Sequence, residues 1–262
     1  LLLISVVASV LALVPAGIGI ARKVRTLGRT TVRLRNPVEP GMWFATMGRA
    51  LIAQLDLLIV GALGTAREIA LYSAPFRLAL LVGLPLVAVN QVVTPLIAGW
   101  FARGETRRLE RTMRGTAGLS LVAAGALGLV FFVLGRQILE ALFGTAYGDA
   151  FPVLVILVIG QILQTWSGSC GFAMMMTGHH RLYAIVLGIS SVLTAVLDVA
   201  LYKVMGIEGV AIATASMLVA QNVVNMLLMR KLAGIRTTAD LRLIMTEVRE
   251  IRDARRGSPT TS

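Results

Sequence analysis

The sequence predicts an all-α integral membrane protein, a polytopic bundle of about seven transmembrane helices. Two observations support this fold class: the amount of apolar sequence, and the confinement of charge to short segments between long uncharged runs. Hydrophobic residues make up 56% of the 262 residues, the mean hydropathy is +0.81, and only 15% of the residues are charged. A soluble domain must cover its surface with polar groups, whereas a surface that faces lipid need not.

The apolar runs have the length of membrane-spanning helices. A bilayer core of about 30 Å requires roughly 20 apolar residues per helix. Seven runs meet this requirement, at residues 1–20, 42–63, 78–100, 116–134, 151–176, 182–202 and 209–229. The first run is uncharged and is followed by Arg22 and Lys23, which is typical of a stop-transfer helix rather than of a secretory signal. We therefore expect the chain to begin inside a spanning helix of a longer protein.

The basic residues are concentrated on one side of the predicted membrane. Twenty of them lie in segments 22–40, 102–115, 177–181 and 230–262, and only Arg67, Arg136 and Lys203 lie in the intervening connections. Because Lys and Arg accumulate in cytoplasmic loops, this distribution predicts a multi-pass protein of the cytoplasmic (inner) membrane with a cytoplasmic carboxyl terminus. The net charge of +12 is then a topology signal, and we expect no nucleic-acid partner.

Four parts of the chain follow from this pattern. Residues 1–20 are predicted to be a partial first transmembrane helix, 21–40 a basic cytoplasmic linker, 41–230 a transmembrane lobe of six helices, and 231–262 a cytoplasmic amphipathic helix with a disordered tail. In the last part, Leu241, Ile244, Val248 and Ile251 form an apolar stripe among arginines. Such a helix either rests on anionic headgroups or packs on its own domain.

Four charged residues fall within the apolar runs: Arg49, Asp56, Arg77 and Asp198. A charge in hydrocarbon costs roughly 2.5–3.5 kcal/mol, so each requires a partner or a wet cavity. One interpretation pairs Asp56 with Arg77 across a helical hairpin. The other assigns Arg49, with or without Arg77, to an anionic diphosphate headgroup in a central cavity, because a guanidinium donates two parallel hydrogen bonds and stays charged.

The other polar positions in the runs also have two interpretations. Asp198 either pairs with Lys203 or reaches interfacial water, or it is a carboxylate that couples transport to a proton or cation. Asn90 and Gln91 lie between Pro85 and Pro95, and proline kinks a helix. They, with Gln161 and Gln164, either line a polar cavity or make hydrogen bonds between helices.

The residues that catalysis or metal binding would need are scarce. The chain has one cysteine, Cys170, and two histidines, His179 and His180, which are adjacent in a short turn. These numbers exclude an intrachain disulfide and a cysteine or histidine metal cage. No nucleophile elbow, phosphate-binding loop or paired carboxylates at metal spacing are present. We expect a protein that is not an enzyme and has no cofactor.

Three loose motifs resemble a known family in their order and spacing. They are Gln54-Leu-Asp-Leu-Leu-Ile-Val-Gly61 followed by residues 68–78, residues 138–150 before an apolar run, and Met176-Thr-Gly-His-His-Arg181 followed by residues 203–214. The chain thereby resembles the Wzx-like polysaccharide flippases of the MOP superfamily over about residues 42–229. Members of that family often carry Asn where Asp198 stands.

The resemblance implies one lobe, the carboxyl-terminal one, of a two-lobed transporter with twelve to fourteen helices. It further implies a polyprenyl-diphosphate-linked oligosaccharide as substrate, an amino-terminal lobe of the same protein as partner, and a polysaccharide polymerase as a further partner. A MATE-type exporter of small compounds is the alternative within transporters, and it would use acidic residues in its cavity. A membrane-embedded glycosyl- or acyltransferase is the alternative among enzymes, but the outer loops are short for such a site.

Overall fold

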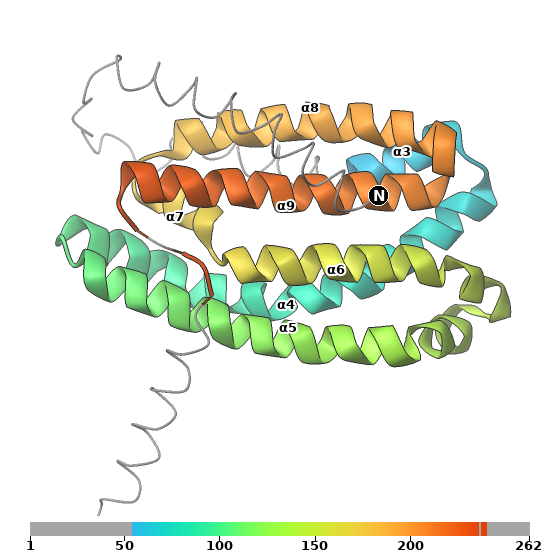
Figure 1. Cartoon of the computed structure of the whole chain (residues 1–262), viewed down its shortest axis with the longest axis horizontal. Helices are drawn as coiled ribbons and strands as arrows, with labels where there is room; N and C mark the ends of the chain where they lie inside the picture. The colour runs from blue at the N-terminus through green and yellow to red at the C-terminus, as the bar shows by residue number, and fades with distance from the viewer. Residues whose placement is uncertain (1–53, 236, 240–262) are drawn as a thin grey trace, which may run out of the picture.

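The computed structural model describes residues 54–235 and 237–239, and every regular element in this part of the chain is helical. The elements are α3 (Leu55–Leu63), α4 (Ala66–Ala102), α5 (Thr106–Phe143), the 3₁₀ helix η1 (Thr145–Ala150), α6 (Phe151–Ser167), α7 (Cys170–Met176), α8 (His180–Met205) and α9 (Ile207–Leu232). The long helices lie side by side and nearly parallel to one axis (Figure 1). The predicted all-α fold class is therefore confirmed.

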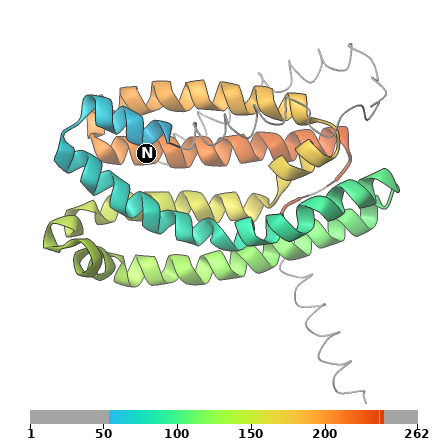
Figure 2. The ribbon, with the colours of Figure 1, turned by 180° about the vertical axis from the view of Figure 1, so that it is seen from behind.

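Five helical segments among the described residues are long and apolar enough to cross a membrane, and they contain α4, α5, α6, α8 and α9. The predicted helix 1–20, most of the run 42–63 and the tail from residue 240 lie outside the described residues. Helices α4 and α5 have 37 and 38 residues, which corresponds to about 56 Å at 1.5 Å per residue. Their hairpin extends beyond the other helices at one end of the bundle (Figures 1 and 2).

Small residues let the helices approach closely. A side chain at Gly160 of α6 would meet Cβ of Ala215 of α9 at 2.9 Å, and one at Gly128 of α5 would meet Ile162 of α6 at 2.6 Å. Close backbone approach is the usual source of helix association in lipid, where apolar burial gives no driving force. Helix α6 thus contacts α4, α5 and α9 and lies at the centre of the described bundle.

Helix α4 begins twelve residues before the predicted run because a capping box fixes its first turn. The Thr65 hydroxyl accepts a hydrogen bond from the Glu68 amide at 3.3 Å, and the Glu68 carboxylate accepts one from the Thr65 amide at 2.8 Å. These bonds satisfy backbone donors that the first turn leaves unpaired. The Tyr202 hydroxyl at the end of α8 also donates to Glu68, at 3.2 Å. The turn between α3 and α4 is thereby joined to α8.

The fifth predicted run is two helices rather than one. Helix α6 ends at Ser167, Gly168 has a φ of +70°, and α7 begins at Cys170. A Cβ at Gly168 would lie 2.5 Å from the Thr237 carbonyl oxygen and 2.9 Å from Cβ of Ala117. Glycine is required here because the chain after α9 crosses at this point and the backbone is left-handed. Hydropathy alone shows no break at this position.

The described charges separate between the two ends of the bundle. At the end where α4 joins α5 and where α9 stops, which we call the basic end, lie eight basic residues: Arg103, Arg107, Arg108, Arg111, Arg114, Arg181, Arg230 and Lys231. At the opposite end lie Arg67, Arg136 and Lys203 with Glu68, Glu140, Asp149 and Glu208. The connections between helices alternate between these ends (Figure 2), as the alternation of charge along the sequence requires.

Candidate functional site

Each of two helical hairpins carries one carboxyl group and one hydroxyl group, and all four groups lie at the same depth in the bundle. In the hairpin of α3 and α4, Asp56 and Tyr72 are each eight residues from Gly64 at the turn. In the hairpin of α8 and α9, Asp198 and Thr214 are each eight residues from Gly206. Eight residues of helix span about 12 Å. The four side chains therefore lie about two helical turns below the end of the bundle opposite to the basic end.

These four residues form one contact cluster, which we call the carboxyl pair site. The hydroxyls of Tyr72 and Thr214 are 3.2 Å apart, and the Thr214 hydroxyl donates to the Val210 carbonyl at 2.9 Å. The Asp56 carboxyl lies within reach of both hydroxyls and of the Asp198 carboxyl. Tyr72 and Asp198 have no exposed surface, and Asp56 has 6%. Groups from four helices thus meet at a site where three of the four side chains are buried and Thr214 is partly buried.

The carboxyl pair has no positive neighbour among the described residues. Both oxygens of Asp198 are buried and find no hydrogen-bond donor among the described residues. No ion pair of the described part of the chain contains Asp56 or Asp198. Two ionised carboxylates this close repel each other strongly in a medium of low dielectric constant. The arrangement is chemically suited to hold one positive charge, as a proton shared between the carboxyls or as a small cation bound by carboxyl and hydroxyl oxygens.

The structure separates the charged residues that the sequence analysis considered together. Arg77 is exposed on α4 and does not pair with Asp56 among the described residues, so the predicted hairpin ion pair is not formed there. Asp198 does not pair with Lys203, which is exposed. Arg49 lies outside the described residues, and its assignment to a diphosphate group stays a prediction. Exposed Arg77 stays a candidate for the same role.

The other predicted polar positions are used in contacts between helices or lie at the surface. Asn90 is buried, and its side-chain oxygen accepts a hydrogen bond from the Ser169 hydroxyl where α6 gives way to α7. Gln161 of α6 lies against Gly83 of α4, where a Cβ would meet its Oε1 at 2.7 Å. Gln164 is partly buried, and its backbone carbonyl accepts a hydrogen bond from the Ser167 hydroxyl at 2.6 Å within α6. Gln91 is exposed.

His179 lies in the connection between α7 and α8, at the basic end, and His180 is the first residue of α8. His179 is partly buried, and its Nδ1 lies 3.2 Å from the Thr177 hydroxyl. Burial lowers the pKa of His179 and the neighbouring His180 lowers it as well, although a hydrogen bond to the Thr177 backbone opposes this shift. No carboxylate partner of His179 is found among the described residues. The pair therefore forms a polar turn and not an acid–base dyad.

A pH dependence of stability follows from this pKa shift. The unfolded chain binds a proton at His179 near pH 6.5, whereas the folded protein binds it only at lower pH. We expect stability to fall as the pH decreases from about 6.5, and we expect His179→Gln to make this fall smaller. Thermal unfolding of both proteins at pH 5.5–8.0 measures the effect. Equal pH dependence of the two proteins would contradict it.

Sequence reasoning found the two carboxylates but not their partners, Tyr72 and Thr214. A usable signal was present. In an antiparallel hairpin, residues equally distant from the turn share a depth, so Thr214 could have been matched to Asp198 and Tyr72 to Asp56. The contact between the two hairpins depends on tertiary packing, and no spacing in the sequence gives it.

Comparison with known proteins agrees with this architecture. No family model matches the chain. A solved MOP superfamily transporter from Pyrococcus furiosus, described as having a binding pocket of reverse polarity, matches with a TM-score of 0.51 and 20% identity. That match covers 77% of this chain and 45% of the transporter. The chain has the fold of a MOP superfamily transporter.

A curated relative is also similar to this chain. The probable low-salt glycan biosynthesis flippase of Haloferax volcanii is 27% identical over 173 residues. The match covers 65% of this chain and 36% of that flippase, so the chain spans about a third of the relative's length. The resemblance to Wzx-like MOP flippases that the sequence motifs predicted is confirmed by these two comparisons. The chain is a multi-pass membrane protein.

A conventional metal centre is not found in the described part of the chain, since no group of three or more His, Cys, Asp or Glu side chains converges there. The carboxyl pair site has two carboxyls and two hydroxyls instead. This donor set consists of oxygen atoms alone, which suits hard cations and protons rather than transition metals.

Proposed function

We propose that the protein is a flippase that moves a polyprenyl-diphosphate-linked oligosaccharide across the cytoplasmic membrane. The similarity to the Haloferax volcanii glycan flippase supports the substrate class. The mechanism is inferred from the carboxyl pair. A buried pair of carboxyls must gain or lose a positive charge when it moves between a buried and a hydrated environment. Transport is then driven by uptake of a proton or small cation at Asp56 and Asp198.

The coupling follows from the positions of the two carboxyls. Asp56 belongs to α3, and Asp198 belongs to α8, in separate hairpins. A positive charge between the carboxyls draws α3 and α8 together, and its release lets them separate. A ligand that favours one of two arrangements shifts the population toward that arrangement. Alternating access between two lobes requires such a bistable element.

The remaining features of the proposal concern orientation and partners. The basic end faces the cytoplasm, consistent with eight described basic residues there against three at the opposite end. The amino-terminal lobe of the same protein forms the other wall of the cavity, and a polysaccharide polymerase receives the product. Arg49 and Arg77 bind the diphosphate. The parts 1–20, 21–40, 41–230 and 231–262 keep the roles predicted for them.

A MATE-type exporter is the second candidate, and the carboxyl pair favours it specifically. An exporter of cationic compounds needs acidic groups inside the bundle, and Asp56 and Asp198 are buried whereas Arg77 is exposed. Nothing comparable in the described residues favours a glycosyl- or acyltransferase.

Reconstitution of the full-length protein tests the two candidates. Proteoliposomes would contain either a fluorescent polyprenyl-diphosphate oligosaccharide, whose accessibility to an external glycosidase reports flipping, or a cationic dye. We expect flipping at least about tenfold above protein-free vesicles, dependent on an imposed proton or sodium gradient, and no gradient-driven movement of the dye. Dye movement without flipping would replace the flippase by the exporter.

A further inference from the structure

A second polar contact lies directly outside the carboxyl pair site, toward the end of the bundle opposite to the basic end. It joins Glu68 of α4 to Tyr202 of α8, whose hydroxyl donates to the Glu68 carboxylate at 3.2 Å. Glu68 is four residues before Tyr72 on α4, and Tyr202 is four residues after Asp198 on α8. Residues four apart lie on one face of a helix, about 6 Å apart along its axis. The two contacts are therefore stacked layers, and the Glu68–Tyr202 layer is the outer one.

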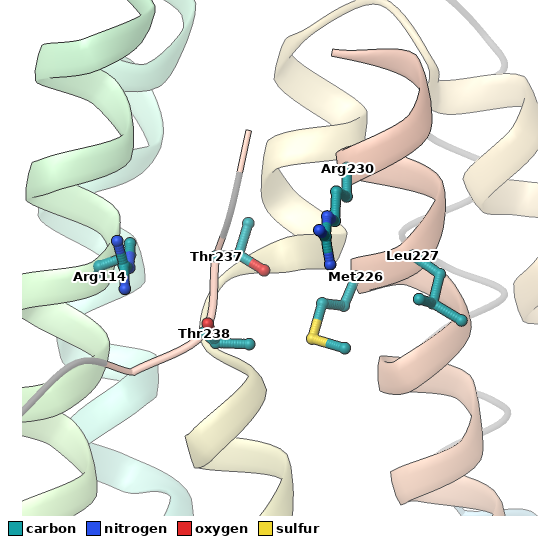
Figure 3. Close-up of a pocket in the computed structure, with 6 residues that line it drawn as sticks. All are labelled: Arg114, Met226, Leu227, Arg230, Thr237 and Thr238. Carbon is teal, nitrogen blue, oxygen red and sulfur yellow. The ribbon is translucent and has the colours of Figure 1, made fainter. Parts of the chain in front are cut away.

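Exposure to solvent decreases from the outer layer to the inner layer. Glu68 and Tyr202 are partly exposed, whereas Tyr72 and Asp198 have no exposed surface. A proton or cation that reaches the carboxyl pair from this end therefore leaves water at the Glu68–Tyr202 layer. The cavity in Figure 3, with a volume of about 260 Å³, lies between α5 and α9 at the basic end. It is no part of this route.

The hydrogen bond to Tyr202 is additional to the capping box that fixes the first turn of α4. Oε2 of Glu68 accepts from the Thr65 amide at 2.8 Å and from the Thr65 hydroxyl at 2.9 Å, whereas Oε1 accepts from Tyr202. A Cβ at Gly64 would lie 2.8 Å from the Tyr202 hydroxyl, so glycine at the turn leaves room for this contact. The hydrogen bond between Glu68 and Tyr202 can thus break while the helix cap stays intact.

This contact connects the two hairpins that hold the carboxyl pair. Glu68 follows the turn of the hairpin that contains Asp56, and Tyr202 precedes the turn of the hairpin that contains Asp198. A hydrogen bond to a charged group changes an equilibrium by about tenfold to a hundredfold. A bond of this strength keeps the outer ends of the hairpins together most of the time and still lets them separate.

We propose that the Glu68–Tyr202 contact is the outer gate of the carboxyl pair site. The proton or small cation enters from the side opposite to the basic end when the hydrogen bond breaks, and the re-formed bond closes the site behind it. The negative charge of Glu68 attracts the cation to the open gate. The proposal rests on the proposed function for the identity of the ion, whereas access to the carboxyl pair is a separate property that is measured without transport.

The test measures access to Asp198 in the full-length protein. A membrane-impermeant quaternary carbodiimide, which modifies carboxyl groups, is added to right-side-out membrane vesicles, and peptide mass spectrometry gives the rate at which Asp198 is labelled. We expect Tyr202→Phe to raise this rate by about tenfold or more, because phenylalanine lacks the donor. Glu68→Gln keeps a residue that can form the capping box. It should raise the rate by about threefold, because a neutral hydrogen bond is roughly half as strong as a charged one.

Two controls distinguish a gate from a general loosening of the bundle. Tyr147→Phe removes a partly buried hydroxyl at the same end, on η1 beside Phe143, and should leave the labelling of Asp198 within about twofold. Reaction of the buried Cys170 with a maleimide reports opening of the whole bundle and should be the same in all variants. Unchanged labelling of Asp198 in Tyr202→Phe, an equal rise in Tyr147→Phe, or a parallel rise at Cys170 would overturn the gate.

A leak measurement separates the gate from the proposed function. Proteoliposomes without glycan lipid contain a pH-sensitive or sodium-sensitive dye, and an imposed gradient decays through the protein. We expect Tyr202→Phe to speed the decay of one of the two gradients, and the double variant Tyr202→Phe/Asp198→Asn to lose this effect. Faster labelling without faster decay of either gradient would support the gate and contradict ion coupling at the carboxyl pair. Unchanged labelling would contradict the gate whatever the decay shows.

Discussion

Replacement of Asp198 by asparagine should reduce gradient-driven transport by about tenfold to a hundredfold. This factor corresponds to the loss of a hydrogen bond to a charged group, which contributes about 1.5–3 kcal/mol. Asp198 has no exposed surface, and its oxygens face Asp56 without a donor among the described residues. An amide is nearly isosteric with a carboxyl group, but it cannot take up a proton or balance a cation. The folded protein should be no less stable, because its NH₂ group can donate to Asp56.

The measurement is the initial rate of flipping in proteoliposomes with and without the imposed gradient. Asp149→Asn is the matched control, because Asp149 is exposed and contacts Arg67 at 3.8 Å outside the carboxyl pair site. The double variant Asp56→Asn/Asp198→Asn should be no slower than either single variant, since two residues that act as a unit are not additive. Full transport by Asp198→Asn would exclude the coupling role.

Replacement of Gly209 by alanine should destabilise the protein by about 3 kcal/mol, the upper end of the cost of over-packing. A Cβ at Gly209 would lie 2.2 Å from the backbone carbonyl oxygen of Leu201 and 2.6 Å from its carbon. These are backbone atoms of α8, so no side-chain rotation relieves the clash, and the hairpin of α8 and α9 must open. Because this hairpin aligns Asp198 with Thr214, we also expect transport to fall.

The control for Gly209 is Gly188→Ala in the same hairpin. A Cβ at Gly188 meets nothing within 4 Å, and alanine is favoured over glycine inside a helix by about 0.5–1 kcal/mol. Gly188→Ala should therefore be slightly more stable than the original protein. Thermal unfolding in detergent measures both variants. The proposed close packing would be wrong if Gly209→Ala unfolded at the same temperature as Gly188→Ala.

The helices themselves were predictable because lipid imposes a simple rule on sequence. Five predicted runs coincide with described helices, and their middle residues agree, since a span must be apolar throughout. The helix ends were less predictable. Helix α4 starts at a capping box formed by Thr65 and Glu68, and α6 stops at Gly168 because Thr237 crosses there. The first cause is local and visible in sequence, whereas the second is tertiary.

The candidate site was predicted in its parts but not in its pairing. Asp56 and Asp198 stand out because a carboxylate in an apolar run is expensive. The 141 positions between them contain nothing that specifies their contact, and the local partners Arg77 and Lys203 were the natural expectation. The structure instead buries both carboxyls between hairpins and leaves both cations exposed. That outcome follows from which helix faces pack, a property of the whole bundle.

The three prolines inside helix α4 make it easier to bend than the other long helices. Pro75, Pro85 and Pro95 follow one another at ten-residue intervals, and each proline leaves the carbonyl four residues earlier without its helical donor. At these three points, bending breaks no hydrogen bond, so the resistance of the rod to flexing is lower there than in α5. The helix runs obliquely across the bundle (Figure 2) and contacts α3, α5, α6 and α7. Strain from a moving neighbour can therefore be taken up within α4, while α8 and α9, which contain no proline, resist bending.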